Sequence, residues 1–409
     1  MLRSQPTASA LLLLLLTAGA CSQNTRYAFL NRLGYGSAEE VSQYYAAMTD
    51  APPEATLREW MRSRCFDTSQ KFAFYYNPTD LGLGREVRCA QCAQGRISCV
   101  VSNHGTPMGI ELAQGKSRAE ASAKSLLAVD KYVAKEARAD GFFDPRNPPP
   151  SGPEFRGASV AMDYDPARVA DERVRFYIYD FENPEQLTPP NRVPAGLIPQ
   201  LQLDNEGVKS IRNCMNCHGG SYDEARNVIV GASFLDLNVP LMQFGPDDSP
   251  RTSRTANLDR MRTINQLVMN TDPAIGIQER LCANYGLKYP CKTADMRSLA
   301  PRVPAGWEAN PDLYHQVIDP YCATCHFSQR REFLPLFSTL RDHNLRPNLD
   351  DLRPLTFRSL TEWLNPTLQK AIRQGVCGAA DMPHAEVTRL NLAADPQALP
   401  LLCPQGAVP

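Results

Sequence analysis

Two short segments of the chain combine two cysteines and a histidine at one spacing. They read Cys214-Met215-Asn216-Cys217-His218 and Cys322-Ala323-Thr324-Cys325-His326. Two thiols three positions apart can each form a thioether with one vinyl group of the same porphyrin, while the next residue offers its imidazole to the iron. With 13 cysteines and 6 histidines in 409 residues, about 0.006 copies of this pattern are expected by chance. The spacing therefore predicts two covalently attached haem c groups.

The competing interpretations of these segments are a disulfide and a zinc site. A zinc ion would need two further ligands close by, and a disulfide would not explain the same histidine twice. A third cysteine pair, Cys89 and Cys92, has the same spacing but is followed by alanine. Without a histidine it is not expected to hold haem, and a disulfide role is favoured over a metal or thiol-redox role.

With both motifs in view, residues 190 to 390 resemble the c-type cytochrome family, and the pair resembles dihaem c-type cytochromes of bacteria. The resemblance also rests on "DMPH" at 381–384. It implies that Met382 is the sixth ligand of the second haem iron, with His384 as a rival and core packing as the alternative. A thioether ligand would raise the reduction potential relative to a second imidazole.

The first haem has no equally clear sixth ligand. Each of the candidates can also be an ordinary structural residue, and the sequence does not choose among them. They are Met162, Met242, Met261, Met269 and His104.

The elements that must position these residues are predicted from periodicity. "EGVKSIRNC" and "NPDLYHQVIDPYC" are interpreted as helices running into each attachment segment. Helices are also expected within residues 26–63 and over 116–139, and the period of two between 159 and 179 predicts an antiparallel strand pair with one buried face. From about residue 186 the strand signal vanishes. The expected fold class is mainly α with loops, as two cytochrome c-like haem domains preceded by a mixed α+β N-terminal domain.

The expected domains are a signal peptide over 1–20, the mixed domain over 21–185, and haem domains over 186–300 and 301–409. "RVPAG" occurs at 192–196 and again at 302–306, at nearly the same distance before each motif. This repeat indicates a duplicated unit, although chance is an alternative in a chain rich in proline and alanine.

The first residues indicate export. A basic start and a short apolar run with six consecutive leucines end in Ala-Gly-Ala before Cys21, which is typical of a secretory signal. Cys21 resembles the lipidation site of bacterial lipoproteins, and plain cleavage is the alternative. The sequence thus predicts a protein of the periplasm or a bacterial membrane surface, anchored to the membrane through Cys21.

Composition limits the remaining possibilities. The chain has 43 basic and 44 acidic residues, so no overall field favours binding to nucleic acid. Eight cysteines lie outside the haem motifs and Cys21, which suits disulfides in an oxidising space. The pairs Cys282–Cys291 and Cys377–Cys403 are expected, whereas three pairings remain open for Cys65, Cys89, Cys92 and Cys99.

Electron transfer between a redox donor and a redox acceptor protein is the function that these features favour. The alternative is an enzyme resembling dihaem cytochrome c peroxidases, which would reduce peroxide at the first haem if its iron has an open position. No catalytic acid or base can be placed for it. A third possibility is an assembly lipoprotein whose N-terminal domain docks on a redox partner.

Overall fold

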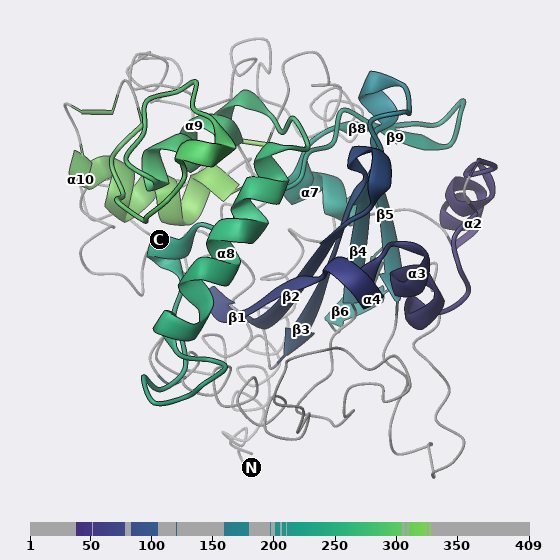
Figure 1. The fold of residues 1–409 in the computed structure, drawn as a ribbon. Coiled ribbons are helices and arrows are strands. Elements are labelled where there is room, and N and C mark those ends of the chain that lie inside the picture. The colour runs from purple at the N-terminus through teal and green to yellow at the C-terminus, as the bar shows by residue number, and fades with distance from the viewer. Residues whose placement is uncertain are drawn as a thin grey trace, which may run out of the picture.

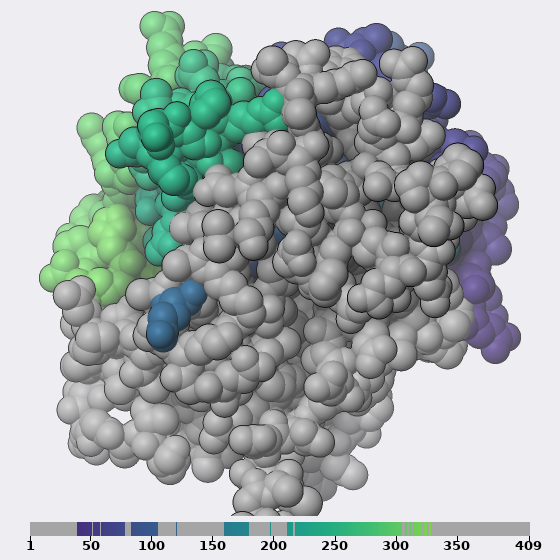
Figure 2. Space-filling model, turned by 90° about the horizontal axis from the view of Figure 1, so that it is seen from below, coloured from purple at the N-terminus to yellow at the C-terminus, as the bar shows by residue number. Residues whose placement is uncertain are grey.

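The computed structural model describes residues 38–50, 52–77, 83–104, 120, 159–179, 197, 201–204, 207–209, 211–304, 307–308, 311–324 and 327–328. A central sheet separates three N-terminal helices from a helical layer formed by later parts of the chain (Figure 1). The same division is visible from below, where the N-terminal helices and the green segments lie at opposite sides of the view (Figure 2). Among the described residues, no helix is long and apolar enough to cross a bilayer.

The sheet has five antiparallel strands in sequential order. They are β1 Lys71–Asn77, β2 Leu83–Gln91, β3 Ile97–His104, β4 Ser159–Tyr164 and β5 Val174–Tyr179. The predicted antiparallel pair is confirmed, because β4 and β5 are aligned with Met162 opposite Phe176. The expectation of one buried face is wrong. Successive side chains point to opposite faces, and both Phe176 and Tyr177 are fully buried.

The N-terminal helices cover one face and one edge of this sheet. They are α2 Ala38–Ala46, α3 Leu57–Ser63 and α4 Phe66–Ser69. Helices α2 and α3 confirm the helices predicted within residues 26–63, whereas α4 lies beyond that range. A capping box begins α3: the Glu59 amide donates to Thr56 Oγ1 at 3.3 Å and the Thr56 amide donates to Glu59 Oε2 at 3.2 Å. Trp60 of α3 packs on Tyr177, with ring centroids 5.6 Å apart. This contact places α3 on the Tyr177 face.

The later segments contribute short strands and helices. The strands form two hairpins, β6 Leu201–Asp204 with β7 Gly207–Lys209 and β8 Ser221–Asp223 with β9 Val228–Val230. The helices are α8 Arg254–Met269, α9 Ile275–Asn284, α10 Pro311–Leu313 and a π-helix over Tyr314–Ala323. The amide of Phe74 in β1 donates to Asn257 Oδ1 of α8 at 2.9 Å. Helix α8 therefore lies along β1 (Figure 1).

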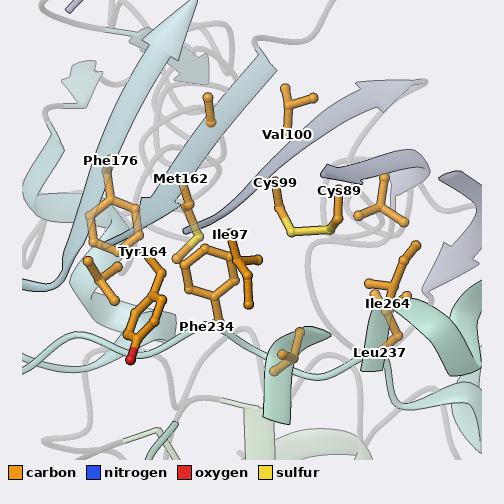
Figure 3. Packing of buried hydrophobic residues seen from close by; sticks show 14 of the residues in the cluster. Cys89, Ile97, Cys99, Val100, Met162, Tyr164, Phe176, Phe234, Leu237 and Ile264 are labelled. Atoms are coloured by element: carbon orange, nitrogen blue, oxygen red, sulfur yellow. A yellow bond between two sulfur atoms is a disulfide. The ribbon is translucent and has the colours of Figure 1, made fainter. Parts of the chain in front are cut away.

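One hydrophobic core joins the sheet to the later helices. Met162 and Phe176 of the sheet, Phe234 of the loop after β9, and Ile264 of α8 belong to the same buried cluster (Figure 3). The cluster continues to Phe327. The predicted fold class is wrong for the described residues, which form a mixed α/β structure built on a five-stranded antiparallel sheet. Helix α8 is hydrogen-bonded to β1 and shares its buried side chains with the sheet, so the core is not a helical bundle.

Two details of the secondary structure prediction are corrected in the same region. Strands do occur after residue 186, as β6 to β9. "EGVKSIRNC" is not a helix, because it contains β7 and a 3-10 helix over Ile211–Cys214. Strands of three or four residues are too short to show a period of two, so their pattern cannot be recognised. "NPDLYHQVIDPYC" is helical as predicted, although most of it is a π-helix. The predicted helix over 116–139 lies outside the described residues apart from Glu120.

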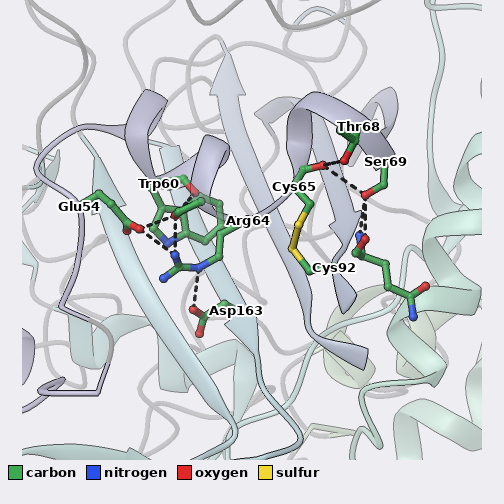
Figure 4. The surroundings of a disulfide bond; sticks show 10 residues. Glu54, Trp60, Arg64, Cys65, Thr68, Ser69, Cys92 and Asp163 are labelled. Carbon is green, nitrogen blue, oxygen red and sulfur yellow. Dashed lines mark hydrogen bonds and ion pairs between the residues drawn. A yellow bond between two sulfur atoms is a disulfide. The ribbon is translucent and has the colours of Figure 1, made fainter. Parts of the chain in front are cut away.

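Three disulfides stabilise the described part of the chain. The predicted Cys282–Cys291 bond is confirmed. The four N-terminal cysteines pair as Cys65–Cys92 and Cys89–Cys99, so Cys89 and Cys92 have disulfide roles but not with each other. The Cys65–Cys92 bond ties the α3–α4 junction to the end of β2, beside an ion pair of 3.2 Å between Arg64 and Asp163 of β4 (Figure 4). Cys377 and Cys403 lie outside the described residues.

Candidate functional site

The first motif forms two consecutive helical turns on the sheet. The 3-10 helix Ile211–Cys214 continues directly into α7 Met215–His218. Ile211 and Met215 are buried in the shared core, so these two apolar side chains fix the orientation of the turn. Cys214 and Cys217 retain their thiols and are half-buried. Cys214 thus ends the 3-10 helix, and Cys217 follows it by three positions in α7.

The Cys214 thiol lies close to the α2 side chains Tyr44 and Tyr45, whose pKa values are raised chiefly by their burial. Burial, together with the smaller effect of the neighbouring Cys217, raises the pKa of Cys214 to about 12. The thiol is therefore protonated at neutral pH. Next to it, Arg212 stacks on the Tyr222 ring at 4.3 Å.

The His218 side chain is held by the backbone of Ser233. His218 Nδ1 lies 2.9 Å from the Ser233 carbonyl oxygen, and the Ser233 amide donates to the His218 carbonyl at 2.8 Å. A carbonyl oxygen can only accept, so Nδ1 carries the ring proton and Nε2 keeps its lone pair. Metal-binding histidines are commonly oriented in this way by a partner on the second ring nitrogen. The contact therefore prepares Nε2 to bind a metal.

The surroundings of His218 keep its imidazole neutral. The pKa of His218 is lowered to about 4, chiefly by burial; the hydrogen bond to Ser233 opposes this shift, and the charge of Arg85 on β2 adds to it. The Phe176 ring of β5 meets the imidazole edge-on, with centroids 5.1 Å apart. His218 therefore lies on the Phe176 face of the sheet, opposite to α3.

Two glycines allow the chain to bring Ser233 to His218. Gly219 and Gly220 have φ angles of 69° and 84°, in the left-handed region that other residues avoid. A Cβ atom on Gly220 would overlap the Val230 carbonyl oxygen and would lie 2.7 Å from the Ala232 nitrogen. Gly220 is thus required by the close approach of the segment that leads to Ser233.

The second motif is described only in part. Cys322 is on the backbone of the π-helix Tyr314–Ala323, whereas Cys325 and His326 lie outside the described residues. The residue that follows His326, Phe327, is buried, and its amide donates to the Ala323 carbonyl at 2.9 Å. Met382, His384 and Cys21 also lie outside the described residues, so the predicted ligand of the second iron and the anchor stay predictions.

The structure places all five candidates for the sixth ligand of the first haem. Met162 is the cross-strand partner of Phe176 and therefore shares the sheet face on which His218 lies. His104 is buried at the end of β3, five positions after Cys99. Because Cys99 pairs with Met162, an odd separation puts His104 on the other face. Met242 lies in a loop after β9, and Met261 and Met269 lie on α8.

Sequence reasoning missed the two residues that contact His218. Phe176 was predicted only as a buried strand residue. Ser233 had no signal, because it binds His218 through backbone atoms that every residue possesses. The competing zinc interpretation finds no ligand set in the described part of the chain, where no three His, Cys, Asp or Glu side chains are grouped for a metal. No protein-family model, curated protein or solved structure matches the chain.

Proposed function

We propose that this protein is an exported dihaem c-type cytochrome that transfers electrons between two redox proteins. The proposal is supported most directly by the hydrogen bond from His218 Nδ1 to the Ser233 carbonyl. That bond fixes the tautomer in which Nε2 can bind iron. The fold offers no separate support, since the described residues do not form the expected cytochrome c-like domains.

The residues of the first motif fit a covalently attached haem. Cys214 and Cys217 would bind the two vinyl positions, and neutral His218 would be an axial ligand. Bound haem would supply a reversible one-electron iron couple. The protein supplies burial and orientation: Ile211 and Met215 anchor the turn, and Ser233 orients the imidazole.

The proposed location follows from the N-terminal residues. An exported chain anchored through a lipid at Cys21 would remain at the periplasmic or outer surface of a bacterial membrane. Soluble or membrane-bound redox proteins at that surface would be its electron donor and acceptor.

Counting the haems tests the proposal. We expect the mature protein, produced with haem maturation machinery, to carry the mass of two haem groups and to show the absorption spectrum of haem c. Cys214→Ala with Cys217→Ala should remove one haem, and Cys322→Ala with Cys325→Ala should remove the other. The matched control is Cys282→Ala with Cys291→Ala, which removes a disulfide and should leave both haems. A wild-type protein with no added haem mass would overturn the proposal.

A second measurement separates electron transfer from peroxide chemistry. We expect both haems to be reduced by a small electron donor and reoxidised by an oxidised cytochrome. Added peroxide should give no catalytic turnover. Sustained peroxide reduction would show that the protein is an enzyme of the peroxidase type and would contradict the proposed role as an electron carrier.

A further inference from the structure

An arginine of α8 lies against the sheet without a carboxylate partner. The Arg260 guanidinium carbon is 4.4 Å from the centre of the Phe72 ring of β1, where α8 runs along that strand (Figure 1). Arg260 is half-buried, and its Nη1 is buried without a hydrogen-bond partner. Two positions later, Arg262 pairs with Asp259 at 3.1 Å. Arg260 has no such ion pair within the described part of the chain.

The surroundings of Arg260 are positively charged. The Arg88 guanidinium carbon of β2 lies 5.5 Å from the centre of the same Phe72 ring. Arg88 is compensated by an ion pair with Glu86, whereas Arg260 is not. Burial, and to a smaller extent the charge of Arg251, lowers the pKa of Arg260. A half-buried cation close to another cation is unfavourable unless an anion approaches it.

A second arginine of α8 adds to this charge. Arg254 is exposed, and its guanidinium carbon lies 5.4 Å from the centre of the Phe244 ring. It too has no ion pair among the residues that the structure describes. Arg254 and Arg260 stand three positions before and after Asn257, whose Oδ1 accepts the Phe74 amide. The two arginines therefore flank the contact between α8 and β1, about 9 Å apart along the helix axis.

Arg260 lies on the face of the sheet away from the first motif. Cross-strand neighbours project to the same face of a sheet. One row of such neighbours crosses all five strands, and its members are Phe72, Arg88, Val100, Ala161 and Tyr177. His218 lies on the opposite face, against Phe176. A ligand of Arg260 is therefore distinct from the proposed first haem.

We propose that Arg254 and Arg260 of α8 form a binding site for a phosphate group. A guanidinium offers paired N–H donors that match the oxygens of a phosphate. Stacking on Phe72 and Phe244 uses the flat face of each guanidinium and leaves its N–H groups for a ligand. The phosphate group belongs either to a soluble phosphate compound or to the headgroup of an anionic lipid. The site does not depend on the proposed function.

Titration calorimetry with inorganic phosphate tests the site. The protein is the full chain carrying Cys21→Ser, so that no lipid anchor contributes. We expect saturable binding that weakens as sodium chloride is added. Arg260→Gln should weaken the binding by at least about tenfold, because hydrogen bonds from a charged donor are lost. Arg262→Gln is the matched control, since this arginine of the same helix already pairs with Asp259, and it should bind phosphate like the wild type.

Sedimentation with vesicles identifies the source of the phosphate group. The same proteins are mixed with vesicles of phosphatidylcholine, with and without phosphatidylglycerol. Binding that requires phosphatidylglycerol and is lost in Arg260→Gln supports the site and assigns it to a lipid headgroup. Saturable binding of inorganic phosphate without vesicle binding supports it and assigns it to a soluble compound.

The inference has clear contrary outcomes. No binding in either assay would overturn it, and so would binding that Arg254→Gln and Arg260→Gln leave unchanged. If Arg260→Gln fails to fold, Arg254→Gln decides, because its side chain is exposed. These substitutions should leave the haem content as in the wild type, so failure of the phosphate site would not affect the proposed function.

Discussion

Single backbone positions decide the geometry around His218. The Ser233 amide and carbonyl face the His218 carbonyl and Nδ1, and this pairing depends on Gly220 having no side chain. A group that acts through its backbone is unaffected by most substitutions. The sensitive residue in this part of the site is therefore the glycine and not the serine.

Gly220→Ala is expected to lower the free energy of unfolding by about 2–4 kcal/mol, because it adds steric overlap to the strain of a positive φ. The control is Gly95→Ala. Gly95 also has a positive φ, 76°, but a Cβ atom added there would lie 3.6 Å from Pro166, which is an ordinary contact. The Gly95→Ala substitution should therefore cost only about 1 kcal/mol of stability. Denaturant titration followed by circular dichroism measures both. Equal losses would contradict a role for close packing at Gly220.

Helix α2 acts as a cover for the open edge of the sheet. β5 is an edge strand, and unpaired backbone amides are costly when buried. The Phe176 amide donates to the Tyr44 hydroxyl at 3.0 Å and the Ile178 amide donates to the Tyr45 hydroxyl at 3.3 Å. Side chains of a helix thereby complete the hydrogen bonds of the strand that contacts His218.

Tyr44→Phe is expected to cost about 1–3 kcal/mol of stability, since the Phe176 amide would lose its acceptor in a buried place. Tyr222→Phe is the matched control. Tyr222 is half-buried, its hydroxyl donates to Asn227 at 3.2 Å, and its loss should cost at most about 1 kcal/mol. Thermal and denaturant unfolding would give both values. A Tyr44 variant as stable as the control would mean that water replaces the hydroxyl at the sheet edge.

At the scale of the whole molecule, a buried ionic network joins segments that are distant in sequence. Arg280 pairs with Asp236 through two of its nitrogens and lies near Asp319. Breaking a buried ion pair costs far more than the pair contributes, because the remaining charge has no water around it. Burial raises the pKa of Asp319 in spite of the nearby Arg280. The carboxylates of Asp236 and Asp319 are therefore expected to contribute differently to the stability of the folded protein.

Asp236→Asn is expected to cost about 3 kcal/mol or more, whereas Asp319→Asn should cost about 1 kcal/mol or less at neutral pH. A raised pKa means that the folded protein binds this proton more tightly than the unfolded chain. The stability that Asp319 contributes is then complete below its unfolded pKa of about 4 and is lost as the pH rises through the folded pKa. Asp319→Asn cannot titrate, so its stability relative to wild type should improve between pH 4 and 7. A constant difference in denaturant titrations at these pH values would contradict this.

The short separation of two cysteines along the chain and the local pattern of side chains were sufficient for several correct predictions from sequence. The Cys282–Cys291 disulfide joins cysteines nine residues apart. Helix α3 begins at its own capping box, and in β4 Val160, Met162 and Tyr164 alternate with smaller or charged residues. The two haem attachment motifs are of this local kind as well, and they stay predictions that the haem count tests.

The tertiary structure alone decided what depends on distant partners. It paired Cys65 with Cys92 and Cys89 with Cys99, which sequence left among three possibilities. It replaced the expected helical domains by one core shared between the sheet and α8. It also brought Ser233 to His218 across fifteen residues. These features depend on which surfaces bury each other. The sequence does not specify the partner of an apolar side chain, because many partners can bury it equally well.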